Sequence, residues 1–513
     1  MSPAVAPSLL PLFVVIPLLG AGLLVLARQR AVEVALLIAV PIVMLLGSIW
    51  LLLYHRTEPP LSHAVGGYVD MLAIPFVSDS LSALMLLVTS ISTLAASVFL
   101  VLTGESRYRF VPPLVLLLTA GVNGALLTGD LFNLFVWVEV MLMPSYALIA
   151  VTGTWRRLGI GRLFVLVNLL TSTILVIGVG FVYGTAGTVN LAALAGAGSE
   201  NTVTAAALAV VLLALAVKGG MVPVHSWLPR AYPATSAGIM ALFSALHTKV
   251  ALYAMYRITA ITFEDGLPFL SVLVVLVIVT ILVGAFSTAG TNRIRSAMGH
   301  QMVAGVGHIL LGLVLLTEVS FAAGILYLVH HVVTMSALLL TTGAIEHTYG
   351  SGRIDHLSGL ARRDPWTMGI LALGLFSLVG LPPTSGLWGK VGLMRASAEQ
   401  ATAGDALLGW AALAAVVIAS VASLLGLQRL WRALAWGEDM TVYRPDDPTT
   451  GRGTDVPLPD DVRIPWRLLA PGAAMMALSL VIFVGIGALL PAVDSSAADL
   501  LDVGSYVGAV MNE

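Results

Sequence analysis

The residues best placed to do chemistry are four charged groups inside long apolar runs, Glu139, Lys218, Lys249 and Lys390. The three lysines are the only ones in the 513-residue chain, although lysine and arginine together number 25. An ionised side chain at the centre of a bilayer costs about 2.5–3.5 kcal/mol on insertion scales. Such groups must face the interior of a helix bundle, pair with one another or contact water, and by default they indicate a functional site.

The chemistry that these residue types favour is proton transfer. Arginine stays protonated in proteins, whereas a lysine that is removed from water releases its proton more readily. Burial disfavours the charged forms of lysine and glutamate, and closeness of the two opposes that effect. Moving one neighbouring charge therefore switches the protonation of a buried Glu–Lys pair. The structural alternative is a lysine near a helix end that extends to the interface, which Glu139 near mid-span cannot easily do.

Five histidines lie in or beside the same apolar runs and can titrate near neutral pH. A single histidine of this kind is more often a satisfied structural residue, so they are relay candidates only in combination with the lysines. His247 and Lys249 are two residues apart, about 200° around a helix, and should face different neighbours. The five are His225, His247, His308, His330 and His331.

The composition indicates that a membrane surrounds these groups. The chain is 58% hydrophobic and only 10% charged, against about 25% charged residues in soluble domains. Its net charge of -2 provides no basic surface for nucleic acid. Cysteine is absent, which excludes disulfides and cysteine-ligated metal centres, and no phosphate-binding glycine motif begins a helix. We therefore predict an all-α polytopic membrane protein with no cofactor of its own.

Fourteen apolar segments are long enough to be transmembrane helices. The first has its arginines after the apolar run, which is typical of a retained helix rather than a cleaved signal peptide. The segments are 8–27, 31–54, 77–103, 110–128, 131–152, 160–184, 203–232, 235–260, 267–290, 299–317, 321–346, 366–398, 405–435 and 466–490.

The arginines are distributed unevenly between the two sides of this arrangement. Only Arg56, Arg257 and Arg395 fall on loops of one side, against nineteen on the other. Because positively charged loops face the cytoplasm, we expect the arginine-rich loops, including the polar stretch 437–465, to be cytoplasmic and both termini outside. The nineteen are Arg28, Arg30, Arg107, Arg109, Arg156, Arg157, Arg162, Arg230, Arg293, Arg295, Arg353, Arg362, Arg363, Arg429, Arg432, Arg444, Arg452, Arg463 and Arg467.

Two of the fourteen segments are interrupted by glycine and proline. The seventh reaches Lys218, meets Gly and Pro residues at 219–223 and continues over 225–232. The twelfth is interrupted at 381–386, before a second piece that carries Lys390. Such pairs of broken helices are typical of inverted repeats around an ion site, although ordinary proline kinks give the same pattern. The lysine beside each break favours an ion site, because a freed carbonyl or a water molecule could hold its proton.

Three motifs, in their order and spacing, resemble the antiporter-like subunits shared by Mrp cation/proton antiporters and respiratory complex I. They are GDLFNLFVWVE at 129–139, KGGMVPVHSWLP at 218–229, and GLPP at 380–383 followed by Gly389-Lys390. The resemblance covers about 77–435 and is greatest to the D-type branch of the Mrp proteins. It implies fourteen helices, with spans 4–8 and 9–13 as inverted five-helix repeats. The implied regions are 1–109 (helices 1–3), 110–260 (first repeat), 261–436 (second repeat), 437–465 (loop) and 466–513 (helix 14 and an outside tail).

The resemblance also implies roles for the buried charges. Glu139 matches a glutamate of span 5 that pairs with Lys218 of span 7. Lys249 matches the lysine of span 8 on the central axis of the membrane. Lys390 matches the residue of span 12 on the exit side.

One position departs from the family pattern. His330 aligns with a histidine of span 11, after which the family often has a lysine five residues later. This chain has Met335 there. Either His331 takes that role, or the second repeat carries protons differently.

The implied function is that of an ion-translocating component of a multi-subunit Na⁺/H⁺ antiporter of the cell membrane, with a role in pH homeostasis. Its partners would be the Mrp subunits of types A, B, C, E, F and G, the ions Na⁺ and H⁺, and membrane lipid. One alternative is the proton-pumping subunit of a redox complex, such as NADH–quinone oxidoreductase or a membrane hydrogenase. Another is a secondary transporter that works alone.

A sodium site would need several oxygen ligands. Glu139 with the hydroxyls of Ser145, Thr171 or Ser172 could supply some of them. Periodicity alone does not place these four side chains together, so the sequence leaves any metal site unknown.

Overall fold

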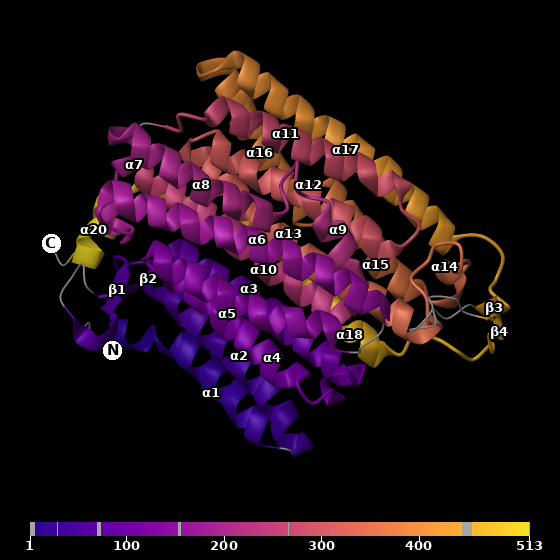
Figure 1. Ribbon diagram of the computed structural model, residues 1–513. Helices are drawn as coiled ribbons and strands as arrows, with labels where there is room; N and C mark the ends of the chain where they lie inside the picture. The colour runs from indigo at the N-terminus through magenta and orange to yellow at the C-terminus, as the bar shows by residue number, and fades with distance from the viewer. Residues whose placement is uncertain are drawn as a thin grey trace.

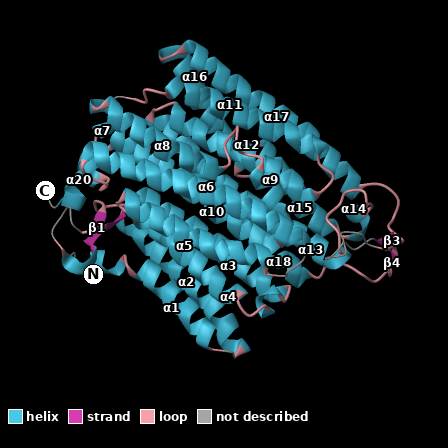
Figure 2. Ribbon diagram, viewed as in Figure 1, coloured by secondary structure: helices cyan, strands magenta, loops and turns pink. Residues whose placement is uncertain are grey.

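The structure is a computed structural model that describes residues 6–27, 29–68, 73–151, 155–264, 266–443 and 454–511, without the side chains of 155–157. Long helices lie side by side in one bundle, and both chain ends are marked at the same end of it (Figure 1). The opposite end carries α14 (Leu360–Arg363) together with β3 (Val442–Tyr443) and β4 (Val456–Pro457). Helix is the dominant structure throughout (Figure 2).

The first part of the chain forms three long helices and a small hairpin. The helices are α1 (Leu12–Leu26), α2 (Arg30–Tyr54) and α3 (Ser80–Leu102). Between α2 and α3, β1 (Leu61–Ala64) pairs antiparallel with β2 (Pro75–Ser78), a hairpin that the sequence did not predict. Asp79 begins α3 with a capping box, in which its side chain accepts from Ser82 N while the Ser82 hydroxyl accepts from Asp79 N.

The next helices position Glu139 and two of the lysines. They are α4 (Val111–Leu127), α5 (Leu131–Ala150), α6 (Trp155–Ala186), α7 (Ala197–Glu200), α8 (Thr202–Gly219), α9 (Trp227–Ala231) and α10 (Ala237–Thr262). The predicted interruption after Lys218 is present, because α8 ends at Gly219 and α9 begins at Trp227. Gly220 has φ +88°, a left-handed conformation that ends helices and favours glycine.

The second half repeats this pattern of long and interrupted helices. It contains α11 (Leu270–Ser287), α12 (Ile294–Val314), α13 (Glu318–Tyr349), α15 (Pro365–Val379), α16 (Gly386–Ala403) and α17 (Ala406–Ala435). The predicted second interruption separates α15 from α16, and Gly380 there has φ +91°. The last helices are α18 (Trp466–Val484), α19 (Ile486–Leu501) and α20 (Val503–Met511).

Twelve helices of the described residues are long and apolar enough to cross a membrane. Two further apolar helices, α4 and α15, are shorter. The chain is therefore a multi-pass membrane protein. The most apolar windows of α10 and α13 are wholly buried, so these two helices form the centre of the bundle.

Two expectations about charges need correction. Arg257 lies within α10 rather than in a loop, and its buried guanidinium pairs with Asp79. Arg395 also lies within a helix, α16, where it pairs with Glu399. After α18, the helix α19 packs against α3 and α13. Outside the described residues lie Arg28, Arg444 and Arg452 and the side chains of Arg156 and Arg157.

Candidate functional site

The four charged residues singled out in the sequence come from four helices. Glu139 lies on α5, Lys218 on α8, Lys249 on α10 and Lys390 on α16. The three lysines are 6%, 0% and 3% exposed, and Glu139 is partly buried. None of the lysines therefore extends to the surface, and the structural alternative of an interfacial lysine is wrong for all three.

The hydroxyl of Ser172 on α6 joins Glu139 to Lys218. Ser172 Oγ donates to Glu139 Oε1 and accepts a hydrogen bond of 2.8 Å from Lys218 Nζ. Lys218 Nζ also lies 3.5 Å from the carbonyl oxygen of Asn168, one turn earlier on α6. The two charges are thus coupled through one side chain, and three helices meet at this point.

A cavity of about 10 Å³, room for about one water molecule, separates Lys218 from His247. Tyr232 and Asn168 also line it. His247 Nε2 lies 2.7 Å from Ser145 Oγ, and His247 Nδ1 lies 3.3 Å from Tyr232 Oη. A water here would have polar partners on both sides, which is the requirement for an ordered buried water.

Lys249 is fully buried at the middle of the bundle and faces away from this cavity, as the spacing from His247 predicted. Its Nζ donates to Thr248 Oγ1 at 3.1 Å. His331 on α13 lies within electrostatic reach of Lys249. The His331 ring packs on Gly305 of α12, where a Cβ would fall 2.0 Å from His331 Nε2. Neither His331 nitrogen has a hydrogen-bond partner among the described residues.

A third cluster of polar groups surrounds His330 on α13. His330 Nδ1 lies 2.9 Å from Ser385 Oγ at the second helix break and 3.2 Å from Thr334 Oγ1. Ser385 Oγ continues to Ser479 Oγ of α18 at 2.8 Å. Met335, at the position where a lysine was expected from the family pattern, is fully buried.

Lys390 is held by the second helix break. Its Nζ donates to the carbonyl oxygen of Val379, the last residue of α15, at 3.0 Å. It also donates to Ser420 Oγ of α17 at 2.8 Å. A carbonyl at the helix break thus contacts Lys390, whereas Lys218 contacts a hydroxyl and a carbonyl of the neighbouring α6.

Two of the candidate histidines take no part in the hydrogen bonds described above. His308 Nδ1 lies 2.8 Å from Ala304 O of its own helix, and its ring stacks on Tyr327 with centroids 4.9 Å apart. His225 is only partly buried in the first break and does not line the cavity beside Lys218. The structure thus places His247 at the cavity beside Lys218. His331 lies within electrostatic reach of Lys249, and His308 and His330 lie within that of Lys390.

The hydroxyls considered as sodium ligands separate in the structure. Ser172 contacts Glu139, but Ser145 contacts His247 and Thr171 donates to Val167 O of its own helix. Within the described ranges, no group of three or more His, Cys, Asp or Glu side chains is placed to hold a metal ion. Three further polar residues contact the site, namely Asn168 of α6, Ser420 of α17 and Tyr232 of the 3₁₀ turn after α9. No sequence signal marked them, because polar residues of these types are common in apolar segments.

These features define a class of integral membrane protein. Its interior carries buried lysines, a glutamate and histidines, and serine hydroxyls of neighbouring helices form hydrogen bonds to them. The chain belongs to the NADH:quinone oxidoreductase/Mrp antiporter transmembrane family, whose model matches residues 128–423.

Several relatives are similar over nearly the whole chain. The D-type subunit of the Na(+)/H(+) antiporter of Bacillus subtilis (strain 168) is 31% identical over 456 residues, which cover 88% of each protein. A chain of the Mrp complex from Dietzia sp. DQ12-45-1b is 40% identical, with a TM-score of 0.93 over 98% of this chain and 99% of that one. A chain of the membrane-bound sulfane sulfur reductase, an archaeal respiratory membrane complex, is 25% identical, with a TM-score of 0.86 over 98% and 99%.

Proposed function

We propose that this chain is the ion-translocating, D-type subunit of a multi-subunit Na⁺/H⁺ antiporter, a secondary transporter subunit rather than an enzyme. The similarity to a named D-type antiporter subunit and to a chain of an Mrp complex supports this, because both extend over most of the molecule. The observation that carries the proposal is the contact of Glu139 and Lys218 with the same Ser172 hydroxyl. A static scaffold has no need of a titratable pair at that depth.

The proposed topology has fourteen spans, counting α4 and the interrupted pairs α8–α9 and α15–α16 as one span each. Spans 4–8 and 9–13, over 110–260 and 261–436, would be inverted repeats. The likeness of the two breaks supports this, since each has a left-handed glycine and a lysine bonded to a serine of a neighbouring helix. Arginine-rich loops would face the cytoplasm and both termini the outside of the cell membrane.

The proposed mechanism begins with the charge on Glu139. When Glu139 takes up a proton, its carboxylate no longer holds the Ser172 hydroxyl, and Lys218 loses its negative partner. Lys218 then releases its own proton to water in the adjoining cavity, across which His247 lies. A proton that passes across this cavity to His247 places a positive charge on α10, which favours proton release at Lys249 and then, through the α13 histidines, at Lys390. Each step transfers one proton between a side chain and water or a neighbouring side chain.

The proposed partners are the other Mrp subunits, of types A, B, C, E, F and G. Purification of the tagged chain from its native membranes tests this, with the co-purifying proteins identified by mass spectrometry. We expect small hydrophobic Mrp subunits, and Na⁺/H⁺ antiport in everted vesicles that depends on their presence. Iron–sulfur subunits in their place would show the redox-complex alternative to be correct, and antiport by the chain alone would show a self-sufficient transporter.

A further inference from the structure

One face of α17 is exposed at the edge of the bundle (Figure 1). Every exposed residue of this helix from 406 to 425 is apolar, and the large ones include Leu407, Ile418, Val421 and Leu425. The buried face over the same stretch consists mainly of glycine and alanine. Because helices in a membrane pack through small residues, the buried face suits contact with other helices, whereas the exposed aliphatic face suits lipid.

The length of this apolar stretch matches the thickness of a bilayer. At 1.5 Å per residue, Leu407 and Leu425 lie about 27 Å apart along the helix axis, and the hydrocarbon core of a bilayer is about 30 Å thick. The next exposed side chains of the helix are Gln428, Arg429 and Arg432. They therefore lie at the level of the lipid headgroups, where tryptophan is enriched, and the exposed Trp436 follows one turn later.

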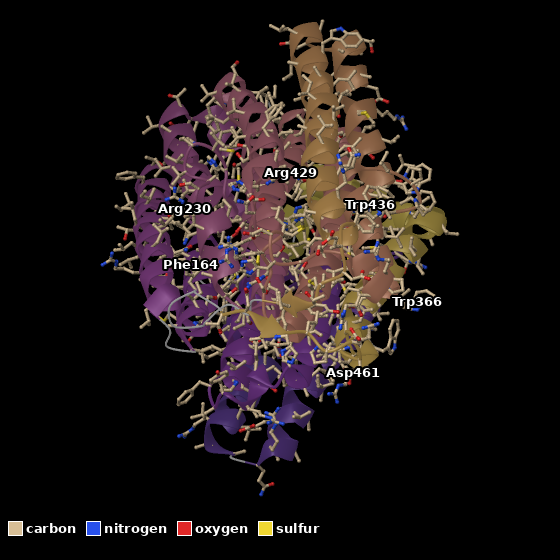
Figure 3. All side chains as sticks on the ribbon, turned by 90° about the vertical axis from the view of Figure 1, so that its right-hand side faces the viewer. Phe164, Arg230, Trp366, Arg429, Trp436 and Asp461 are labelled. Carbon is tan, nitrogen blue, oxygen red and sulfur yellow. The ribbon has the colours of Figure 1, made fainter. Side chains whose placement is uncertain are left out.

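A surface hollow of about 580 Å³ opens at this level. Arg429, Arg432 and Trp436 line it, and Leu425 lines it on the side of the apolar stretch. No aspartate or glutamate is among the described residues that line it. Figure 3 views the molecule from the arginine-rich end and labels Arg429 and Trp436. The hollow thus joins a positively charged surface to an apolar one, the combination that recognises an anionic lipid.

Neither arginine pairs with a carboxylate in the described part of the chain. Arg429 Nη1 donates to the carbonyl oxygens of Ala289 and Thr291 at 2.7 and 2.9 Å. Its Nη2 donates to Asn292 Oδ1 at 2.9 Å. These neutral acceptors hold the guanidinium in place and leave its charge uncompensated. Arg432 lies one turn further on the same face, where like charges repel each other, so an anion between the two would stabilise this end of α17.

We propose that the hollow at the end of α17 binds the headgroup of an anionic phospholipid. The guanidinium of Arg432 would donate to the phosphate oxygens, and Arg429 would supply a second positive charge. The acyl chains would lie along the exposed aliphatic side chains that begin at Leu425. A zwitterionic phospholipid would bind less well, because no carboxylate in the hollow receives its ammonium group. This binding is separate from ion transport and does not rest on the proposed function.

Photo-cross-linking of the complex purified from native membranes tests the proposal. The complex is reconstituted in phosphatidylcholine vesicles that contain a small fraction of either phosphatidylglycerol or phosphatidylcholine with a diazirine in the headgroup region. After illumination, mass spectrometry measures the yield of lipid adducts on residues 425–437. The variants are Arg432→Gln, which leaves the contacts of Arg429 in place, and Arg429→Gln/Arg432→Gln. The matched control is Arg362→Gln/Arg463→Gln, which removes the same charge at exposed positions outside the hollow.

We expect about tenfold more adducts from the phosphatidylglycerol probe than from the phosphatidylcholine probe, because each arginine near an anionic headgroup raises its binding about fivefold. Arg432→Gln should lower this excess about fivefold, the double variant should remove it, and the control should retain it. Equal yields from the two probes, or an excess that the double variant retains, would overturn the proposal. A photo-cross-linking amino acid in place of Gln428 that captures another subunit would also overturn it, by showing that the face is a protein interface.

Discussion

At the scale of single residues, the Ser172 hydroxyl lies between Glu139 and Lys218 and contacts both. A hydroxyl can donate to a carboxylate while it accepts from an ammonium group, so Ser172 links the two charges without bringing them into direct contact. Hydrogen bonds to charged groups contribute about 1.5–3 kcal/mol. The loss of one hydroxyl at this point should therefore uncouple two charges that both remain in place.

Ser172→Ala should lower antiport about tenfold or more while the complex still assembles, because Lys218 would lose the contact that reports the charge on Glu139. Thr171→Ala is the matched control, since that neighbouring hydroxyl donates to its own helix. The measurement is the Na⁺-dependent pH change in everted vesicles, normalised to the amount of complex. Equal losses in the two variants would mean that the effect is structural.

At the scale of helices, the second break creates the site of Lys390. The left-handed glycine that ends α15 leaves the Val379 carbonyl free, and Lys390 takes it. The segment before Gly380 is an ordinary apolar helix. The left-handed conformation of Gly380 ends that helix and leaves the Val379 carbonyl oxygen for Lys390.

Gly380→Ala should destabilise the complex by about 1–2 kcal/mol, because an alanine resists this backbone conformation and its Cβ would fall 2.6 Å from Lys390 Cδ. We also expect reduced antiport, since Lys390 would be displaced. Gly369→Ala in the same helix, where nothing lies within 4 Å of the added Cβ, should be neutral or slightly stabilising. Thermal unfolding of the purified complex measures both, and a neutral Gly380→Ala would contradict this account of the break.

Much of the arrangement of helices along the chain could be predicted from the sequence. Each of the fourteen apolar segments contains a helix, and both breaks occur at Gly–Pro signals. The sequence could not predict which of Ser145, Thr171 and Ser172 contacts Glu139. That contact depends on how α6 is rotated against α5, which no local pattern records. The β1–β2 hairpin was missed because its strands have four residues each, too few for a clear alternation. Arg257 was misplaced because an arginine near a helix end is normally a loop marker, whereas here it has a buried carboxylate partner.

At the scale of the whole molecule, the pair of Asp79 and Arg257 ties distant segments together. Arg257 Nη2 donates to Asp79 Oδ1 at 2.8 Å, so α10 is joined to the start of α3. The guanidinium lies between the rings of Tyr253 and Tyr506, 5.4 and 5.3 Å from their centroids. Because Tyr506 belongs to α20, this contact holds α20 against the central helix α10.

Acid should weaken this contact in a defined range. Burial by itself would raise the pKa of Asp79, but the charge and hydrogen bonds of Arg257 lower it from 3.8 to about 2. Since the folded-state pKa is the lower one, the stabilisation is complete above about pH 4 and is lost as the pH falls through 2. Thermal unfolding of the complex in detergent between pH 5 and 2 measures the loss.

Asp79→Asn should remove that pH-dependent part and destabilise the complex at neutral pH by about 3–5 kcal/mol, because Arg257 would remain buried and unpaired. Asp405→Asn, at an exposed helix cap, is the control and should retain the pH dependence. The same acid response in wild type and Asp79→Asn would assign the effect to another group.

In the proposed mechanism, protons move through the interior of this chain by way of Glu139 and Lys218. Na⁺-driven proton flux by the purified complex in proteoliposomes, compared among wild type, Glu139→Gln and Glu139→Asp, measures this directly. We predict that Glu139→Gln, which has the same shape but cannot ionise, retains less than a tenth of the flux in an intact complex, while Glu139→Asp retains a measurable part. A wild-type rate of proton flux with Glu139→Gln would contradict the account.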